Sequence, residues 1–174
     1  MTQSEKCEEL LMHEVVRIDI MPQTALAVGV PFNLRNITST AVTMSDTSAL
    51  TDARLKAASL LSLNLTGDAM ADAEMKEGGA SHKPTEKREA AGIVRTHTLT
   101  VAIETGMQTV KEKEKALQET DFHMVLSTYG GERWMAYGLP GTSQFTIDEQ
   151  AGQSAQMTVK AVVMSMSGLI RILP

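Results

Sequence analysis

Residues 122–138 read FHMVLSTYGGERWMAYG, and this stretch decides the fold because two glycines separate two apolar segments. A Gly-Gly dipeptide between such segments is typical of a two-residue β-hairpin turn, whose preferred form needs positive φ at both central positions. A two-residue turn at 130–131 places Leu126 opposite Met135. The sequence therefore predicts an antiparallel hairpin with this register.

Both faces of the predicted hairpin carry large apolar side chains. One face has Phe122, Met124, Leu126, Met135 and Tyr137, and the other has Val125, Tyr129 and Trp134. An antiparallel sheet that stands alone usually leaves one face polar. We therefore expect the hairpin to be covered on both sides, by a helix and by a second sheet or another chain.

A long strand and one helix precede the hairpin. Residues 93–103 alternate apolar and polar side chains, which is the period of a strand. Thr105 and Gln108 then match a capping box, and a narrow apolar stripe follows at helical spacing. The sequence predicts a helix over about 106–119. Its Lys-Glu run at 111–115 is typical of a solvated face, so this helix should lie on the outside of a sheet.

Residues 67–92 predict a long polar loop. This segment contains Gly78, Gly79 and Pro84 among densely mixed charges, and little in it can anchor a core. Loops of this length are uncommon in compact domains and are usually functional or disordered. Two interpretations follow, a surface insertion or a loop that becomes ordered against a neighbouring subunit.

The complete pattern predicts a mainly β protein with one flanking α-helix, built as an antiparallel β-sandwich or barrel. Further strands are predicted at 144–148 and 156–166. With 174 residues the chain favours one domain. We expect an N-terminal arm over 1–24 and a single β-sandwich domain over 25–174.

Composition excludes several classes of function. The net charge of −5 argues against nucleic-acid binding as the main activity. A single cysteine, Cys7, excludes an internal disulfide and a cysteine-rich zinc module. No apolar run approaches the length that spans a bilayer, and the first residues do not resemble a secretory signal.

Motifs for catalysis are also missing from the sequence. The four histidines lie far apart, and neither a phosphate-binding loop nor a Gly-x-Ser-x-Gly nucleophile turn occurs. We expect no catalytic, cofactor-binding or metal-binding residues. The Thr-, Val- and Met-rich strands favour an interaction protein over an enzyme.

The order of these elements resembles the phage tail tube family, whose fold is shared with the tube protein of type VI secretion. The resemblance covers about residues 25–172, and it lies in the loop at 67–92, the strand at 93–103, the helix at 105–119 and the hairpin around 130–131. It implies a small β-sandwich or barrel flanked by a helix, with an extended loop that reaches the adjacent ring.

The resemblance also implies a function without catalysis. Subunits of this family assemble into stacked rings that form a conduit, so it implies a homo-oligomer, other tail proteins as partners, and DNA only as transiting cargo. It implies a place in the virion, after assembly in the bacterial cytoplasm. Lys83, Lys87 and Arg88 would then face acidic surface on a neighbouring subunit, and Tyr129 and Trp134 near the hairpin turn would complete the subunit interface.

Other functions remain open at this point. Another virion component, such as a tail terminator, a head–tail connector or a baseplate protein, would share much of the pattern. A standalone β-sandwich module that recognises a carbohydrate or a peptide would use Tyr129 and Trp134 for stacking. The chain has only one Trp, two Tyr and three Phe, which makes such a module less favoured. An enzyme is the third alternative.

Overall fold

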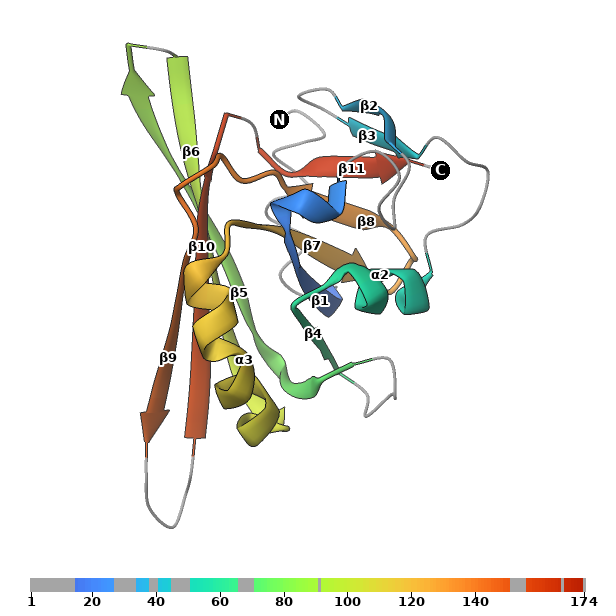
Figure 1. Cartoon of the computed structure of the whole chain (residues 1–174), viewed down its shortest axis with the longest axis vertical. Helices are drawn as coiled ribbons and strands as arrows, with labels where there is room; N and C mark the ends of the chain where they lie inside the picture. The colour runs from blue at the N-terminus through green and yellow to red at the C-terminus, as the bar shows by residue number, and fades with distance from the viewer. Residues whose placement is uncertain are drawn as a thin grey trace.

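A computed structural model shows a mainly β protein whose described strands all belong to one sheet (Figure 1). The strands are β1 (Val15–Pro22), β2 (Leu34–Ile37), β3 (Ala41–Met44), β4 (Leu61–Asn64), β5 (Ala73–Glu89), β6 (Gly92–Thr105), β7 (Phe122–Thr128), β8 (Arg133–Ala136), β9 (Gln144–Gln150), β10 (Gln156–Ser165) and β11 (Ile170–Leu173). The helices are the 3-10 helix η1 (Gln23–Leu26), α2 (Asp52–Ala58) and α3 (Met107–Glu119). The structure describes residues 15–26, 34–37, 41–44, 51–65, 71–90, 92–150, 156–166 and 168–173.

The sheet is open and mixed. Its strand order is β2-β3-β11-β8-β7-β1-β4-β5-β6-β10-β9, so β2 and β9 lie at its two ends. Most neighbours are antiparallel, but β11 pairs with β3 and β4 pairs with β5 in parallel. The predicted mainly β class is confirmed. The predicted antiparallel sandwich or barrel is not confirmed, because the described strands form one open sheet with two parallel pairs.

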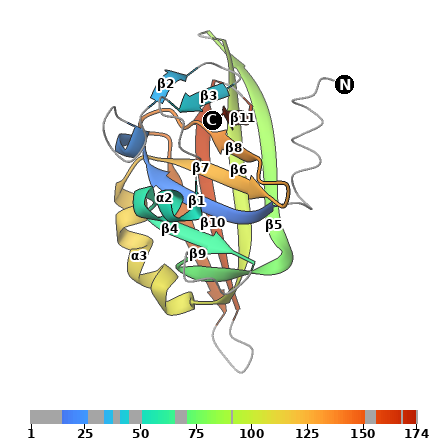
Figure 2. The ribbon, with the colours of Figure 1, turned by 90° about the vertical axis from the view of Figure 1, so that its right-hand side faces the viewer.

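The core lies between two groups of strands (Figure 2). Buried apolar side chains of β6 and β10 cluster with those of β1, β4 and β7; examples are Val101, Ile103, Val159, Ile18, Leu63 and Leu126. Val110 and Leu117 of α3 belong to the same cluster. The helix predicted over about 106–119 is therefore confirmed, and its charged residues face outward.

The start of α3 differs from the predicted capping box. Gly106 is the N-cap residue with φ of 88°, and no side chain caps the helix. A Cβ at Gly106 would lie 2.8 Å from the Cβ of Ala73. Glycine is needed here because the φ is positive and the backbone approaches β5 closely.

The hairpin forms, but its register is shifted by one residue from the prediction. Leu126 pairs with Trp134 and not with Met135. The N–H of Thr128 donates to the carbonyl of Glu132 at 2.9 Å, which leaves three residues in the turn, and the last of them, Gly131, has φ of 82°. A three-residue hairpin loop commonly ends in this left-handed conformation.

Both faces of the hairpin are covered within the chain. Every residue of β7 is buried. Leu126 and Trp134 lie on the core face. Val125 lies on the other face together with its β1 partner Asp19, and α2 packs against β1 on that side. The predicted cover on two sides is confirmed, but the helix on this face is α2 and not the predicted helix at 106–119, which packs beside β9.

The predicted loop at 67–92 is wrong over most of its length. Residues 73–89 form β5, which pairs with β6 from Glu74 opposite Thr105 to Glu89 opposite Gly92. Most side chains of β5 are exposed, so its composition resembles that of a loop although its backbone is paired. Part of the predicted N-terminal arm is also a strand, because β1 lies inside the sheet between β4 and β7. Residues 1–14 lie outside the described residues.

Candidate subunit interface

Among the described residues, one side of β5 has no paired strand over most of its length, and this side is called the free edge of β5. Its parallel partner β4 pairs with it only at Ala73 and Glu74. Beyond these two residues, β6 is the only partner of β5 among the described strands. The β5–β6 hairpin extends past the rest of the sheet in Figure 1. An open edge of this kind presents backbone N–H and C=O groups to another strand.

A second free edge belongs to β9, at the end of the sheet. Within the described part of the chain, β9 pairs only with β10. The strands β5, β6, β10 and β9 are antiparallel to their neighbours, so β5 and β9 run in opposite directions. A second copy placed beside the first in the same orientation would therefore offer its β9 antiparallel to β5, which continues the pattern of the sheet.

Pro84 identifies which backbone N–H groups of β5 point toward the free edge. It lies opposite His97 of β6. Proline has no N–H, so inside a strand it is tolerated where its nitrogen faces away from the partner. Because backbone groups alternate in direction along a strand, Glu86 and Arg88 share this side with Pro84. Their N–H groups therefore point away from β6, whereas Pro84 has no N–H to offer there.

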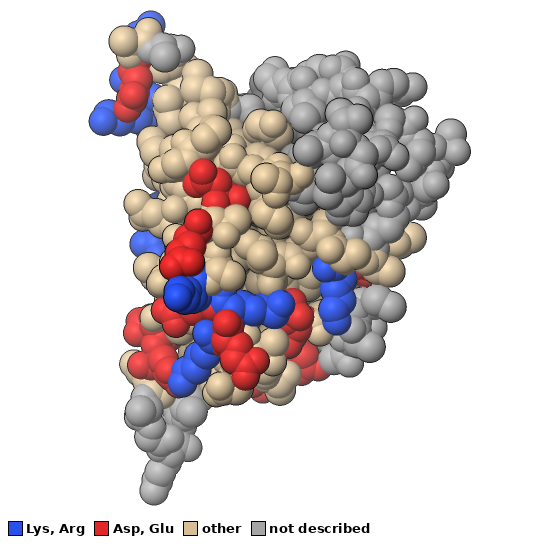
Figure 3. Space-filling model, in the orientation of Figure 1, with Lys and Arg blue, Asp and Glu red and all other residues tan. Residues whose placement is uncertain are grey.

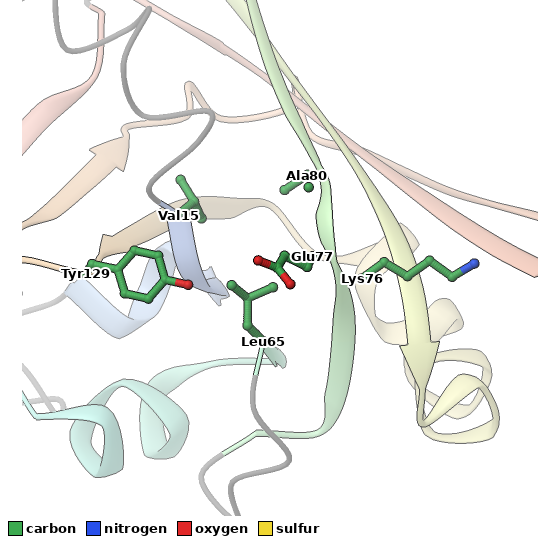
Figure 4. Close-up of a pocket in the computed structure, with 7 residues that line it drawn as sticks. Val15, Leu65, Lys76, Glu77, Ala80 and Tyr129 are labelled. Atoms are coloured by element: carbon green, nitrogen blue, oxygen red, sulfur yellow. The ribbon is translucent and has the colours of Figure 1, made fainter.

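A bulge on β5 opens a pocket beside this edge. Met75 pairs with Ile103 and Ala80 pairs with Val101, so four residues of β5 oppose Ala102 alone. The adjacent pocket has a volume of about 240 Å³ and is lined by Val15, Leu65, Lys76, Glu77, Ala80 and Tyr129. Figure 4 shows that Glu77 and the hydroxyl of Tyr129 point toward one another across the pocket, while Lys76 points away.

The structure brings together some of the predicted interface residues. Lys83, Lys87 and Arg88 are all exposed and lie on β5, beside the free edge. Tyr129 is 72% exposed and lines the pocket. Trp134 is 8% exposed and belongs to the core cluster. The interpretation of Trp134 as a surface contact residue is therefore wrong, because the one-residue change in hairpin register turns its ring inward.

Charged side chains of both signs gather over α3 (Figure 3). Lys111 forms an ion pair with Glu149 of β9 at 2.7 Å, and Gln118 donates to the carbonyl of Phe145 at 3.3 Å. The helix thus lies beside the free edge of β9. Lys115 is on the same helical stripe, four residues after Lys111 and three before Gln118.

Three histidines are buried, and the sequence did not reveal their contacts because their partners are distant along the chain. His82 and His97 stack on neighbouring strands with Nε2 and Nδ1 2.9 Å apart. Burial, followed by the electrostatic effect of His97, lowers the pKa of His82 from 6.5 to about 4. His123 accepts a hydrogen bond from the N–H of Gly138, and burial lowers its pKa to about 4.

These shifts predict that acid destabilises the fold. A histidine that is neutral when folded but has its ordinary pKa when unfolded makes the unfolded state bind more protons between pH 6.5 and 4. Stability should therefore fall as the pH falls through that window, by about 2–3 kcal/mol for His123 alone at pH ~4.5. Replacing His123→Asn keeps an acceptor for Gly138 and removes the ionisation, so urea unfolding at about pH 7 and pH 4.5 should show a smaller loss. An equal loss in both proteins would contradict the assignment.

A buried polar network holds α2 against the sheet. Asp19 is fully buried and receives two hydrogen bonds from Arg17, at 2.8 and 3.1 Å. The hydroxyls of Ser59 and Ser62 also donate to Asp19. Burial raises the pKa of Asp19, while Arg17 and the two hydroxyls act in the opposite direction. Arg133 extends the network by donating to the carboxylate of Asp52 at 2.9 Å.

Among the described residues, this network does not line the pocket beside β5, and one of its atoms, Arg17 Nη1, is buried without a hydrogen-bond partner. Within the described residues, no group of three or more His, Cys, Asp or Glu side chains is placed to hold a metal ion. No described helix is long and apolar enough to cross a membrane. Cys7 lies outside the described residues.

Comparisons with protein-family models, with characterised proteins and with solved structures found no match for this chain. The functional assignment therefore rests on the geometry of the strand edges and of the pocket beside them.

Proposed function

We propose that this chain is a non-enzymatic structural subunit of a phage or phage-like particle, a tail tube protein that assembles into stacked rings. The main support is the pair of free edges on β5 and β9. They belong to one run of four antiparallel strands and have opposite directions, as head-to-tail addition requires. Interfaces of this kind close into rings when the rotation between copies allows it.

In the proposed ring, β9 of each copy pairs with β5 of the next. The four strands β5, β6, β10 and β9 then become part of one continuous sheet around the conduit, and the strands from β1, β4 and β7 form the second layer of a sandwich. The core cluster between these two groups supports this layered arrangement. Other tail proteins would bind the ends of the tube, inside the virion. DNA would pass only as cargo, consistent with the net charge of −5.

The free edge can be tested by removing one backbone donor. Glu86→Pro removes an N–H that points away from β6, so the subunit should still fold while the pairing with the next copy is lost. We expect the native chain to form rings in negative-stain electron microscopy and the variant to remain a monomer by light scattering. Glu86→Ala is the matched control: like the proline variant it loses the 2.8 Å contact with Arg95, but it keeps the N–H and should assemble.

Two outcomes would overturn the proposal. A native chain that remains monomeric when concentrated would instead favour the standalone binding module, with Tyr129 beside its pocket as the stacking group. Normal rings from a folded Glu86→Pro variant would show that β5 is not the paired edge.

A further inference from the structure

The pocket beside β5 lies on the side of the sheet from which a neighbouring copy would present α3. Ala80, Val15 and Leu65 line the pocket and also pack against the core, so the pocket opens on the core face of the sheet. On the opposite edge, α3 contributes to the core and packs against β9, so it lies on that same face. Pairing β9 of one copy with β5 of another keeps the two core faces on one side. The α3 of that copy then approaches the pocket.

The strand register shows which residues of α3 would lie level with the pocket of the neighbouring copy. Ala80 is level with Val101, Val159 and Ile147 across β5, β6, β10 and β9. The position of Ile147 lies between Phe145, which contacts Gln118, and Glu149, which contacts Lys111. The part of α3 level with the pocket is therefore the middle of the stripe from residue 111 to residue 118. Lys115 occupies that position, and ring symmetry places all copies at the same height.

The chemistry of the pocket suits a lysine side chain. Val15 and Leu65 offer apolar walls for the methylene groups, and Glu77 with the Tyr129 hydroxyl offers oxygen atoms for the ammonium group. Lys115 and Glu77 are both exposed, and neither forms an ion pair within the described part of the chain. Lys111 and Lys113 of the same helix already pair, with Glu149 and Asp72.

We propose that the pocket lined by Glu77 and Tyr129 is the docking site for Lys115 of a second copy, and that this contact selects the correct partner edge. This inference rests on the proposed ring assembly. The two strands of a backbone-paired edge can slide along one another. The contact between Lys115 and Glu77 forms in only one of these alignments, so it would set the register between the two copies. The pocket is therefore an interface site between copies of this chain.

A charge exchange tests the contact. Glu77→Lys places two positive charges together in every interface, and Lys115→Glu places two negative charges together. We expect each variant, folded by circular dichroism, to need at least about a tenfold higher concentration to assemble, as measured by light scattering. The double variant should recover assembly. Glu104→Lys is the matched control, because it makes the same charge change at an exposed residue of β6 that does not line the pocket, and it should leave assembly unchanged.

Mixing the two single variants gives a sharper result. Suppose that the two variants alternate around the ring. The pocket of each Glu77→Lys copy then meets the helix of a Lys115→Glu copy, so a positive charge faces a negative one. The unchanged Glu77 of the second variant meets the unchanged Lys115 of the first. The mixture should therefore assemble at a concentration where neither variant does so alone. If both single variants assemble like the native chain while Glu86→Pro does not, the docking of Lys115 is wrong and the ring proposal stands. If the native chain does not assemble, both are wrong.

Discussion

Replacing Asp19→Ala is expected to lower the free energy of unfolding by about 3–5 kcal/mol. The carboxylate is fully buried and holds Arg17, whose side chain is buried as well. Its removal leaves a guanidinium inside the protein without its closest opposite charge. Two serine hydroxyls also lose an acceptor. Urea unfolding, followed by the fluorescence of the single tryptophan, measures the loss.

The double replacement of Arg17→Met and Asp19→Leu separates charge from packing. Apolar side chains of similar volume often substitute for a buried ion pair without loss, because the cost of removing both charges from water disappears. We expect the double variant to recover most of the stability lost by Asp19→Ala. A loss below about 1 kcal/mol in Asp19→Ala would contradict the buried ion pair.

Leu126→Ala should cost about 2–5 kcal/mol, the range for large-to-small changes in a packed core. Leu126 is 1% exposed and lies between Ile18 on β1 and Trp134 on β8. Truncation leaves a cavity at the centre of the sheet, where neighbours on both sides are held by backbone pairing and cannot close it. The same urea titration measures this loss.

Leu126→Met is the matched control, because a change that conserves volume usually costs less than about 1.5 kcal/mol. The tryptophan emission should shift to the red in the alanine variant if Trp134 packs on Leu126. A loss below about 0.5 kcal/mol would show that the hairpin register is wrong.

The parts of the fold that depend on local pattern could be predicted from the sequence. The alternation in 93–103 and the apolar stripe of α3 led to correct elements, since each carries its own period. The hairpin was located correctly, but its register was not, because two-residue and three-residue loops both accept Gly131. The strand β5 was missed entirely, since its polar residues are ordered by pairing with β6 and not by a local apolar face.

The difference between local pattern and long-range pairing also explains which residues of the candidate site could be predicted. Exposed residues such as Lys87 and Tyr129 could be named from composition, because charge and a turn position already favour the surface. Glu77 could not, since its place in the pocket depends on the bulge of β5. Trp134 was misplaced because a single residue of register decides which face of the sheet it occupies.

The strand order also affects when the protein can fold. β1 pairs with β7, which lies about a hundred residues later in the chain, and β7 separates β1 from β8. Contacts between such distant segments slow folding, because the loop between them must be closed before they form. During translation β1 must wait for residues 122–128, and until then its apolar face has no partner from β7.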